Sequence, residues 1–139
     1  MKNSYQGLQK NVRKLKLPKI DTWENQYPER EYAIQIETDE FTCVCPKTGL
    51  PDFATIFIDY APNDECLELK SLKEYFLAYR ELGIFHEHLT NKILDDVVAA
   101  CAPRWAKVTA EMKVRGGILT TVTACYPTSA GELTPKDRL

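Results

Sequence analysis

The chain has 139 residues, of which 44% are hydrophobic and 27% charged, a composition that is ordinary for one globular domain. Its formal net charge of -2 excludes a chain-wide electrostatic attraction to nucleic acid, so we expect no nucleic-acid partner. No apolar run approaches the ~18 residues that span a membrane, and the first residues lack the apolar core of a signal peptide. We therefore expect no membrane association and a cytoplasmic location.

The sequence divides into three parts. In residues 1–30, basic residues are interspersed with few apolar ones and Pro18 and Pro28 interrupt any regular element, which predicts a solvated N-terminal arm. Residues 127–139 form a polar, proline-broken C-terminal tail. We expect residues 31–126 between them to form one catalytic domain.

The first half of this domain has the pattern of strands. Tyr32, Ile34 and Ile36 alternate with polar residues, which predicts a strand. Residues 53–60, FATIFIDY, are rich in β-branched and aromatic residues and predict a second strand, and residues 65–68 predict a short extended piece.

Helical periodicity follows. Apolar residues recur at intervals of three and four over residues 72–82, which predicts an amphipathic helix that stops at Gly83. The same spacing over residues 89–101 predicts a second helix, ended by Pro103.

In the last part of the domain, apolar and polar residues alternate again. Residues 105–114 and 118–126 predict two strands joined by a turn at residues 115–117, where adjacent glycines tolerate positive φ. The order is β-β-α-α-β-β, which predicts an α+β fold with a four-stranded antiparallel sheet and both helices on one face. The sheet edges would need protection, which oligomerisation can provide.

The first candidate site is the loop CPKTGLPD, residues 45–52. Two prolines and a glycine shape a rigid loop that presents Cys45 and then Asp52. A thiolate is the best nucleophile among side chains at neutral pH, Lys47 could lower its pKa, and Asp52 could transfer protons. The alternative is a structural cysteine beside a solvated aspartate.

Two further clusters are candidates for ligand binding. Phe85, His86 and Glu87 could stack on and hydrogen-bond a heterocycle, although a glutamate also suits the first turn of a helix for structural reasons. In ELKSLKEYF, residues 68–76, Lys70 and Lys73 suit a phosphate, while Ser71 could equally be a helix N-cap in a capping box with its glutamate at 74.

Cysteine and histidine spacing does not favour a metal. The five cysteines are an odd number without a secretion signal, which argues against a disulfide framework, and Cys101 and Cys125 lie in apolar periodic runs typical of buried residues. Cys43-Val44-Cys45 and His86-Glu87-His88 lack the spacing of common structural zinc sites, so we expect no metal. There is also no Rossmann or Walker motif for a nucleotide.

Together, these clusters resemble the single-domain 7-cyano-7-deazaguanine reductases, the NADPH-dependent nitrile reductases of queuosine biosynthesis. The resemblance runs from about residue 31 to residue 126 and is carried by CPKTGLPDFATI, ELKSLKEYF, FHE and RGGI. It implies the tunnelling fold, in which subunits join their sheets into an oligomeric barrel with active sites between subunits. Single-domain members usually form a homodecamer of two pentamers.

The resemblance also implies a mechanism. Cys45 corresponds to the nucleophile that adds to the nitrile carbon and forms a thioimide, Asp52 to the general acid, and His86 to a residue that assists proton transfer. The small-molecule substrate is 7-cyano-7-deazaguanine, and its four-electron reduction to the aminomethyl base needs two NADPH per turnover. The residues that correspond to those contacting the base are Leu67, Glu68, Leu69, Phe85, His86 and Glu87, and those associated with NADPH are Lys70, Ser71 and Lys73.

One position departs from the pattern. Some members carry a cysteine three residues after the histidine, able to pair with the nucleophile and protect it from oxidation, and here that position is Leu89. Cys43 would have to replace it, but a disulfide between residues two apart in an extended segment would be strained. We therefore expect Cys45 to be prone to overoxidation.

Three other functions fit part of the pattern. An amidinotransferase acting on the same nitrile within tRNA would share Cys45 and Asp52 but need no NADPH, and the intact residues 68–76 argue against it. A zinc-dependent cyclohydrolase of the same fold would need a better ligand set. A non-catalytic module that binds a purine-like ligand would keep Phe85 and Glu87 but have no use for a reactive cysteine.

Overall fold

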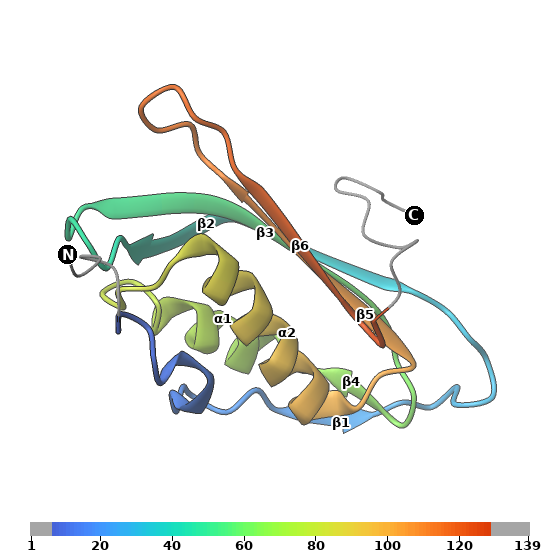
Figure 1. Cartoon of the computed structure of the whole chain (residues 1–139). Helices are drawn as coiled ribbons and strands as arrows, with labels where there is room; N and C mark the ends of the chain where they lie inside the picture. Colours follow the sequence, from blue (N-terminus) through green and yellow to red (C-terminus); the bar gives the residue numbers. More distant parts are fainter. Residues whose placement is uncertain (1–6, 129–139) are drawn as a thin grey trace.

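A computed structural model describes residues 7–128 of the chain (Figure 1). Residues 1–6 of the predicted arm and 129–139 of the predicted tail lie outside this range. The elements in chain order are η1 (Val12–Lys14), β1 (Thr22–Glu24), β2 (Ile34–Val44), β3 (Pro51–Ala61), β4 (Glu65–Leu67), α1 (Leu69–Leu77), α2 (His86–Cys101), β5 (Trp105–Met112) and β6 (Thr121–Tyr126).

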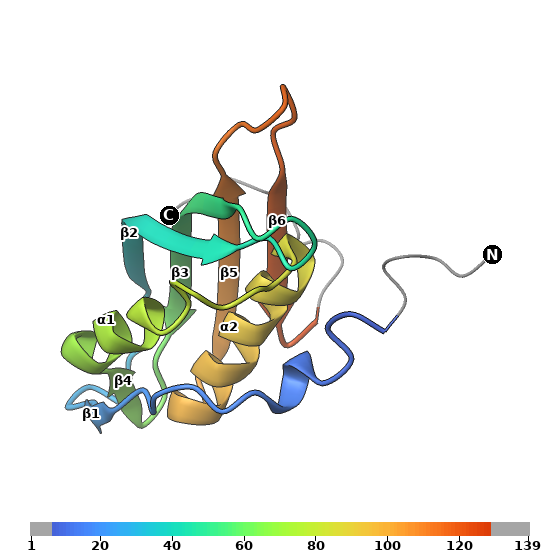
Figure 2. The same ribbon diagram turned by 90° about the vertical axis from the view of Figure 1, so that its left-hand side faces the viewer.

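Strands β2, β3, β5 and β6 form, in this order, one antiparallel sheet, and α1 and α2 lie against one of its faces (Figures 1 and 2). The predicted α+β class with an antiparallel sheet and two helices is confirmed. Strand β2 carries a register shift between Thr38 and Phe41 that lets the strand continue to Val44. In the described chain, β2 and β6 are the edges of this sheet.

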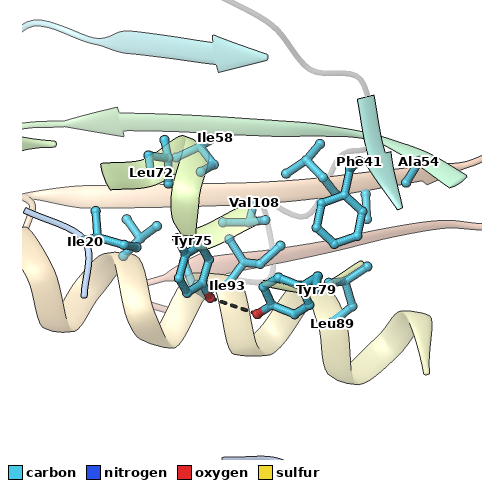
Figure 3. Close-up of a cluster of buried hydrophobic side chains, with 14 of the residues drawn as sticks. Ile20, Phe41, Ala54, Ile58, Leu72, Tyr75, Tyr79, Leu89, Ile93 and Val108 are labelled. Atoms are coloured by element: carbon cyan, nitrogen blue, oxygen red, sulfur yellow. Dashed lines mark hydrogen bonds between the residues drawn. The ribbon is translucent and has the colours of Figure 1, made fainter. Parts of the chain in front are cut away.

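The core lies between the sheet and the helices (Figure 3). Alternation along β3 buries Ala54, Ile56 and Ile58 on the helix side, where they meet Ile93 of α2 and Val108 of β5. Burying one such aliphatic side chain completely stabilises the fold by about 1.5–3 kcal/mol.

A chain of polar groups crosses this core. The hydroxyl of Tyr75 donates to Oδ2 of Asp96 at 2.5 Å and lies 2.8 Å from the hydroxyl of Tyr79, while Nζ of Lys92 donates to Oδ1 of Asp96 at 3.0 Å. The rings of Tyr75 and Tyr79 are fully buried (Figure 3). Burial raises the pKa of both phenols, so both stay neutral and hydrogen-bonded.

Part of the predicted arm packs on the domain. Strand β1 pairs with β4, with Trp23 opposite Cys66, and Ile20 is 4% exposed in the core. Asn25 is also buried and donates to the carbonyl of Asn63. The expectation of a solvated segment is therefore wrong for Ile20 and Asn25, because isolated buried side chains beside a three-residue strand leave no periodic pattern to detect.

Helix α1 ends before the predicted glycine stop. After Leu77 the chain makes tighter turns, with the amide of Tyr79 bonded to Phe76 and that of Leu82 to Tyr79. Gly83 has a different role, because a Cβ there would lie 3.3 Å from Cα of Pro46. This close approach brings the segment before α2 beside the end of β2. The predicted end of α2 at Pro103 is confirmed, with Ala102 in the left-handed region at φ 43°.

Candidate active site

A pocket of about 260 Å³ opens where β3 and α2 both begin. Four segments line it: the end of β2 and its loop, the start of β3, the start of α2, and the loop between β5 and β6. Its residues include Cys45, Asp52, Phe85, His86 and Glu87. One chain therefore brings together the first and second sequence clusters, including the three side chains expected to act in catalysis.

Cys45 lies just after β2, in the turn that leads to β3. The turn is closed by hydrogen bonds from the amide of Cys45 to the carbonyl of Leu50 and from the amide of Gly49 to the carbonyl of Cys45, both 2.9 Å. The amide of Thr48 donates to the sulfur at 3.5 Å. Hydrogen bonds from the side chain and the backbone of Thr48 lower the pKa of the Cys45 thiol.

This cause differs from the one expected from the sequence. From the sequence, Lys47 is the candidate for lowering the thiol pKa, whereas in the structure Thr48 has the larger effect and Lys47 contributes through its backbone amide. The turn geometry determines this, because successive amides of residues 47 and 48 point back toward the sulfur. The negative charge of Asp52 acts in the opposite direction and raises the thiol pKa.

Asp52 lies on the core side of β3, where alternation places it in line with the buried Ala54, and its side chain is 7% exposed. One carboxylate oxygen, Oδ2, lies 3.2 Å from Nε2 of His86. The other, Oδ1, accepts a hydrogen bond from Nη1 of Arg115. The carboxylate is thus held on both sides at the base of the pocket.

Arg115 reaches Asp52 from the loop between β5 and β6. This loop turns at Gly116 and Gly117, with φ of 59° and 79°, so the turn predicted at residues 115–117 is confirmed. A second guanidinium nitrogen lies 3.5 Å from Oγ1 of Thr48, so Arg115 contacts both the loop that follows Cys45 and the start of β3. The sequence indicated the turn but no role for Arg115, because no spacing relates it to Asp52.

The start of α2 forms the opposite wall. Phe85 is the N-cap residue and His86 the first helical residue, while Glu87 is exposed in the first turn. A carboxylate in this position is favoured by the helix dipole. It is also free to accept hydrogen bonds from a ligand at the mouth of the pocket.

The third cluster lies elsewhere. None of the described residues 67–73 lines this pocket, and β4 and the start of α1 lie at the other end of the molecule from the loop of Cys45 (Figures 1 and 2). Leu67 is buried, with its amide bonded to the hydroxyl of Tyr60 at 2.9 Å, whereas Leu69 is 61% exposed. Lys70 and Lys73 are exposed. Within one chain, the third cluster therefore lies far from Cys45.

The N-cap of α1 is Glu68, and the alternative with Ser71 in a capping box is wrong. The Glu68 carboxylate accepts from the amides of Lys70 at 2.6 Å and Ser71 at 2.8 Å, which lowers its pKa. Ser71 is buried instead, where its hydroxyl accepts from the amide of Asp21 and donates to the carbonyl of Glu68. It thereby ties α1 to the N-terminal segment.

Metal ligands do not cluster in the part of the chain that is described: within residues 7–128, no group of three His, Cys, Asp or Glu side chains could hold an ion. Cys43 is fully buried, and burial raises the pKa of its thiol to about 12. Cys101 is buried in the same way and Cys125 partly, and none of the five cysteines, which all lie within residues 7–128, forms a disulfide. Within residues 7–128, no helix has the length and apolar character needed to cross a membrane.

The fold and the pocket define a class: a small α+β protein with one pocket lined by a cysteine of lowered pKa, a buried aspartate and a histidine. The family model described as "QueF-like protein" matches residues 51–130, which include Asp52, His86 and Glu87 and begin just after Cys45. The chain belongs to this family.

Similar curated proteins carry one name. A protein of Chloroherpeton thalassium called NADPH-dependent 7-cyano-7-deazaguanine reductase is 61% identical over 107 residues, 77% of this chain and 92% of that protein. Proteins of the same name from Elusimicrobium minutum and Chlorobaculum tepidum are 60% and 56% identical over 111 and 110 residues, covering 80% and 79% of this chain and 83% and 94% of theirs. The identification of the family from its motifs is confirmed.

A solved structure shares the fold. The apo crystal structure of an archaeosine synthase QueF-Like superposes with a TM-score of 0.63 at 28% identity, covering 67% of this chain and 91% of that one. The architecture is thus common to proteins whose names denote different activities.

Proposed function

We propose that this chain is an NADPH-dependent nitrile reductase that converts 7-cyano-7-deazaguanine to 7-aminomethyl-7-deazaguanine in queuosine biosynthesis. The relatives of this name cover most of the chain at 56% to 61% identity. The observation that carries the proposal is the pocket, which is lined by Cys45, whose thiol has a lowered pKa, together with Asp52 and His86. Cytoplasmic location and a catalytic domain of residues 31–126 belong to the same proposal.

The residues support covalent catalysis. The Cys45 thiolate adds to the nitrile carbon, and a proton passes from Asp52 to the nitrile nitrogen, which gives a neutral thioimide bound to the sulfur. His86, 3.2 Å from Asp52, is placed to return a proton to that carboxylate. Arg115 stabilises the carboxylate left behind.

Reduction follows at the same carbon. NADPH supplies one hydride in each of two steps, so one nitrile, two NADPH and two protons give one amine and two NADP⁺. Cys45 leaves as a thiolate after the first reduction, and its lowered pKa makes it a good leaving group. The exposed Lys70 and Lys73 near the start of α1 fit the negative phosphates of the cofactor, and the buried Ser71, whose hydroxyl bonds to Asp21 and Glu68, holds the start of that helix in place.

Base recognition is assigned to the start of α2. Glu87 accepts from adjacent N–H donors on the pyrimidine edge of the deazaguanine, and Phe85 and His86 contact its ring. Leu67, Glu68 and Leu69 complete the base pocket. Both oxygens of Glu68 already accept from backbone amides, so a further bond to the base would use their second lone pairs.

We propose that a second copy of the chain supplies these last residues. Residues 67–73 lie apart from Cys45 within one chain, while the exposed Phe53 and Ile118 line the pocket of Cys45. In the described chain β2 and β6 are the sheet edges, and apart from the bridge of Val44 to Gly83 no strand pairs with their outer sides, which leaves both edges for pairing between copies. An oligomeric barrel with sites between subunits, in a homodecamer of two pentamers, accounts for the separated residues 67–73, the exposed apolar side chains at the pocket and the sheet edges.

The test is consumption of NADPH by the purified protein with 7-cyano-7-deazaguanine, beside a Cys45→Ala control. Oxidation of two NADPH per base, abolished in Cys45→Ala, is expected. A covalent adduct at Cys45 without NADPH consumption would instead support the amidinotransferase alternative, and absence of both would overturn the proposal.

A further inference from the structure

Gln9, from the N-terminal segment, forms three hydrogen bonds with the turn that carries the start of α2. Its Nε2 donates to the carbonyl of Gly83 at 3.0 Å, and its Oε1 accepts from the amide of Phe85 at 3.1 Å. The same oxygen lies 3.2 Å from Nδ1 of His88. One side chain thus contacts the residues on both sides of His86 and Glu87 along the chain.

The orientation of this carboxamide is unambiguous. Gly83 offers a carbonyl, which only accepts, and Phe85 offers an amide N–H, which only donates. Reversing the carboxamide would bring donor against donor and acceptor against acceptor. Gln9 therefore recognises this turn by a matched pattern of donors and acceptors.

The bond from the Phe85 amide to Gln9 satisfies a backbone donor at the start of α2. Phe85 is the N-cap residue, and its side chain offers no polar atom to cap the helix. Amide groups at a helix start lack partners within the helix, and an unpaired buried amide is costly. Gln9, 76 positions away from Phe85 in the chain, supplies the acceptor.

The segment of Gln9 is itself held in place. Gln9 adopts φ of 67°, a left-handed conformation that is uncommon outside glycine and that persists only where surrounding contacts hold it. Its carbonyl accepts from the amide of Val12, whose side chain packs against the core. Arg13 lies 3.6 Å from Asp95 of α2.

The opposite side of the turn is tied to the nucleophile. The amide of Val44, next to Cys45, donates to the carbonyl of Leu82, and the amide of Ile84 donates to that of Val44. The turn is therefore held between the end of β2 and Gln9. Without Gln9 the turn would keep its bonds to Val44, next to Cys45, but lose the hydrogen bond to the Phe85 amide.

We infer that Gln9 is a positioning residue for base recognition, holding Phe85, His86 and Glu87 at the angle at which they meet the substrate. The inference rests on the proposed function for the identity of the substrate. It gives part of the N-terminal segment a role in the reaction, although Gln9 itself does not line the pocket.

The experiment compares Gln9→Ala with Lys10→Ala, a matched change at the exposed neighbouring position. Loss of the three bonds is expected to raise KM for 7-cyano-7-deazaguanine about tenfold, with KM for NADPH and the Tm close to those of Lys10→Ala. Gln9→Glu keeps the acceptor for Phe85 but loses the donor to Gly83, so its KM should lie between the two. It also replaces Gln9→Ala if that variant does not fold.

Amide hydrogen exchange of peptides covering residues 83–88 gives a readout independent of activity. Exchange should be faster in Gln9→Ala than in Lys10→Ala, with no difference across β5. If the unaltered protein consumed no NADPH, the proposed function would fail while exchange still tested the contact. Unchanged exchange at residues 83–88, an unchanged KM for the base, or a joint rise of both KM values with a lower Tm would each overturn the role of Gln9.

Discussion

Oδ2 of Asp52 lies 3.2 Å from Nε2 of His86, although the two residues are 34 positions apart in the chain. The carboxylate lies on the buried, helix-facing side of β3. The turn before α2 is hydrogen-bonded to Val44 and places the imidazole beside that carboxylate. The contact joins the acid proposed for protonation of the nitrile to an imidazole, a side chain that can both donate and accept a proton.

Replacing Asp52 with Asn keeps the side-chain volume but removes the transferable proton. We expect kcat to fall by about 10²–10⁴, with a matching slowing of thioimide formation followed by stopped-flow absorbance. Asp39→Asn, in an exposed part of β2, is the control and should leave both rates unchanged. Rapid adduct formation in Asp52→Asn would mean that another group delivers the proton.

Thr48 should determine the pH at which Cys45 becomes reactive. Its hydrogen bonds lower the thiol pKa, so thiolate is present at lower pH than for a free cysteine. Thr48→Val removes the side-chain bond, which raises the pKa and shifts the midpoint of iodoacetamide reactivity to higher pH. Thr38→Val, in β2 away from the pocket, should not shift it. An unchanged midpoint in Thr48→Val would show that the side chain has no part in activation.

The shared site predicts complementation between inactive chains. Cys45→Ala lacks the nucleophile, and a Lys70→Ala, Lys73→Ala double variant lacks the proposed phosphate contacts. If each site combines Cys45 of one subunit with residues 67–73 of its neighbour, dissociating and reassembling an equal mixture should make about a quarter of the sites competent. NADPH oxidation by the mixture, compared with each variant alone, measures this. No recovery, with mixed oligomers verified by mass spectrometry, would place the whole site within one chain.

The buried polar chain between α1 and α2 should contribute to stability. Tyr75→Phe removes the bonds to Asp96 and Tyr79 and leaves those partners less satisfied in the core, so we expect a loss of about 1–3 kcal/mol of unfolding free energy. Urea denaturation would measure it. Tyr126→Phe, 40% exposed at the end of β6, should be neutral by comparison. Equal stability of the two variants would contradict a structural role for the network.

Sequence patterns predicted what depends on local spacing and missed what depends on single long-range contacts. Alternation and helical periodicity located the strands and helices, and the motifs led to Cys45, Asp52 and His86, which the fold brings into one pocket. Arg115 and Gln9 act through one polar side chain each, in loops or turns without periodicity, so no pattern relates them to Asp52 or Phe85. The packing of Ile20 was missed for the same reason.

Peroxide should inactivate this protein without full recovery. Cys45 has a thiol of lowered pKa, while the candidate partner Cys43 is fully buried with its thiol pKa raised to about 12, and Leu89 stands where the resemblance to the reductases implies a protecting cysteine. A sulfenic acid at Cys45 therefore lacks a reactive thiolate at either position and goes on to sulfinic acid, which thiol reductants do not reverse. Mass spectrometry after mild peroxide should find sulfinic acid at Cys45, and dithiothreitol should restore only part of the activity. Cys43→Ser should behave identically, whereas greater overoxidation in Cys43→Ser, or full recovery of the unaltered protein, would identify Cys43 as a working guard.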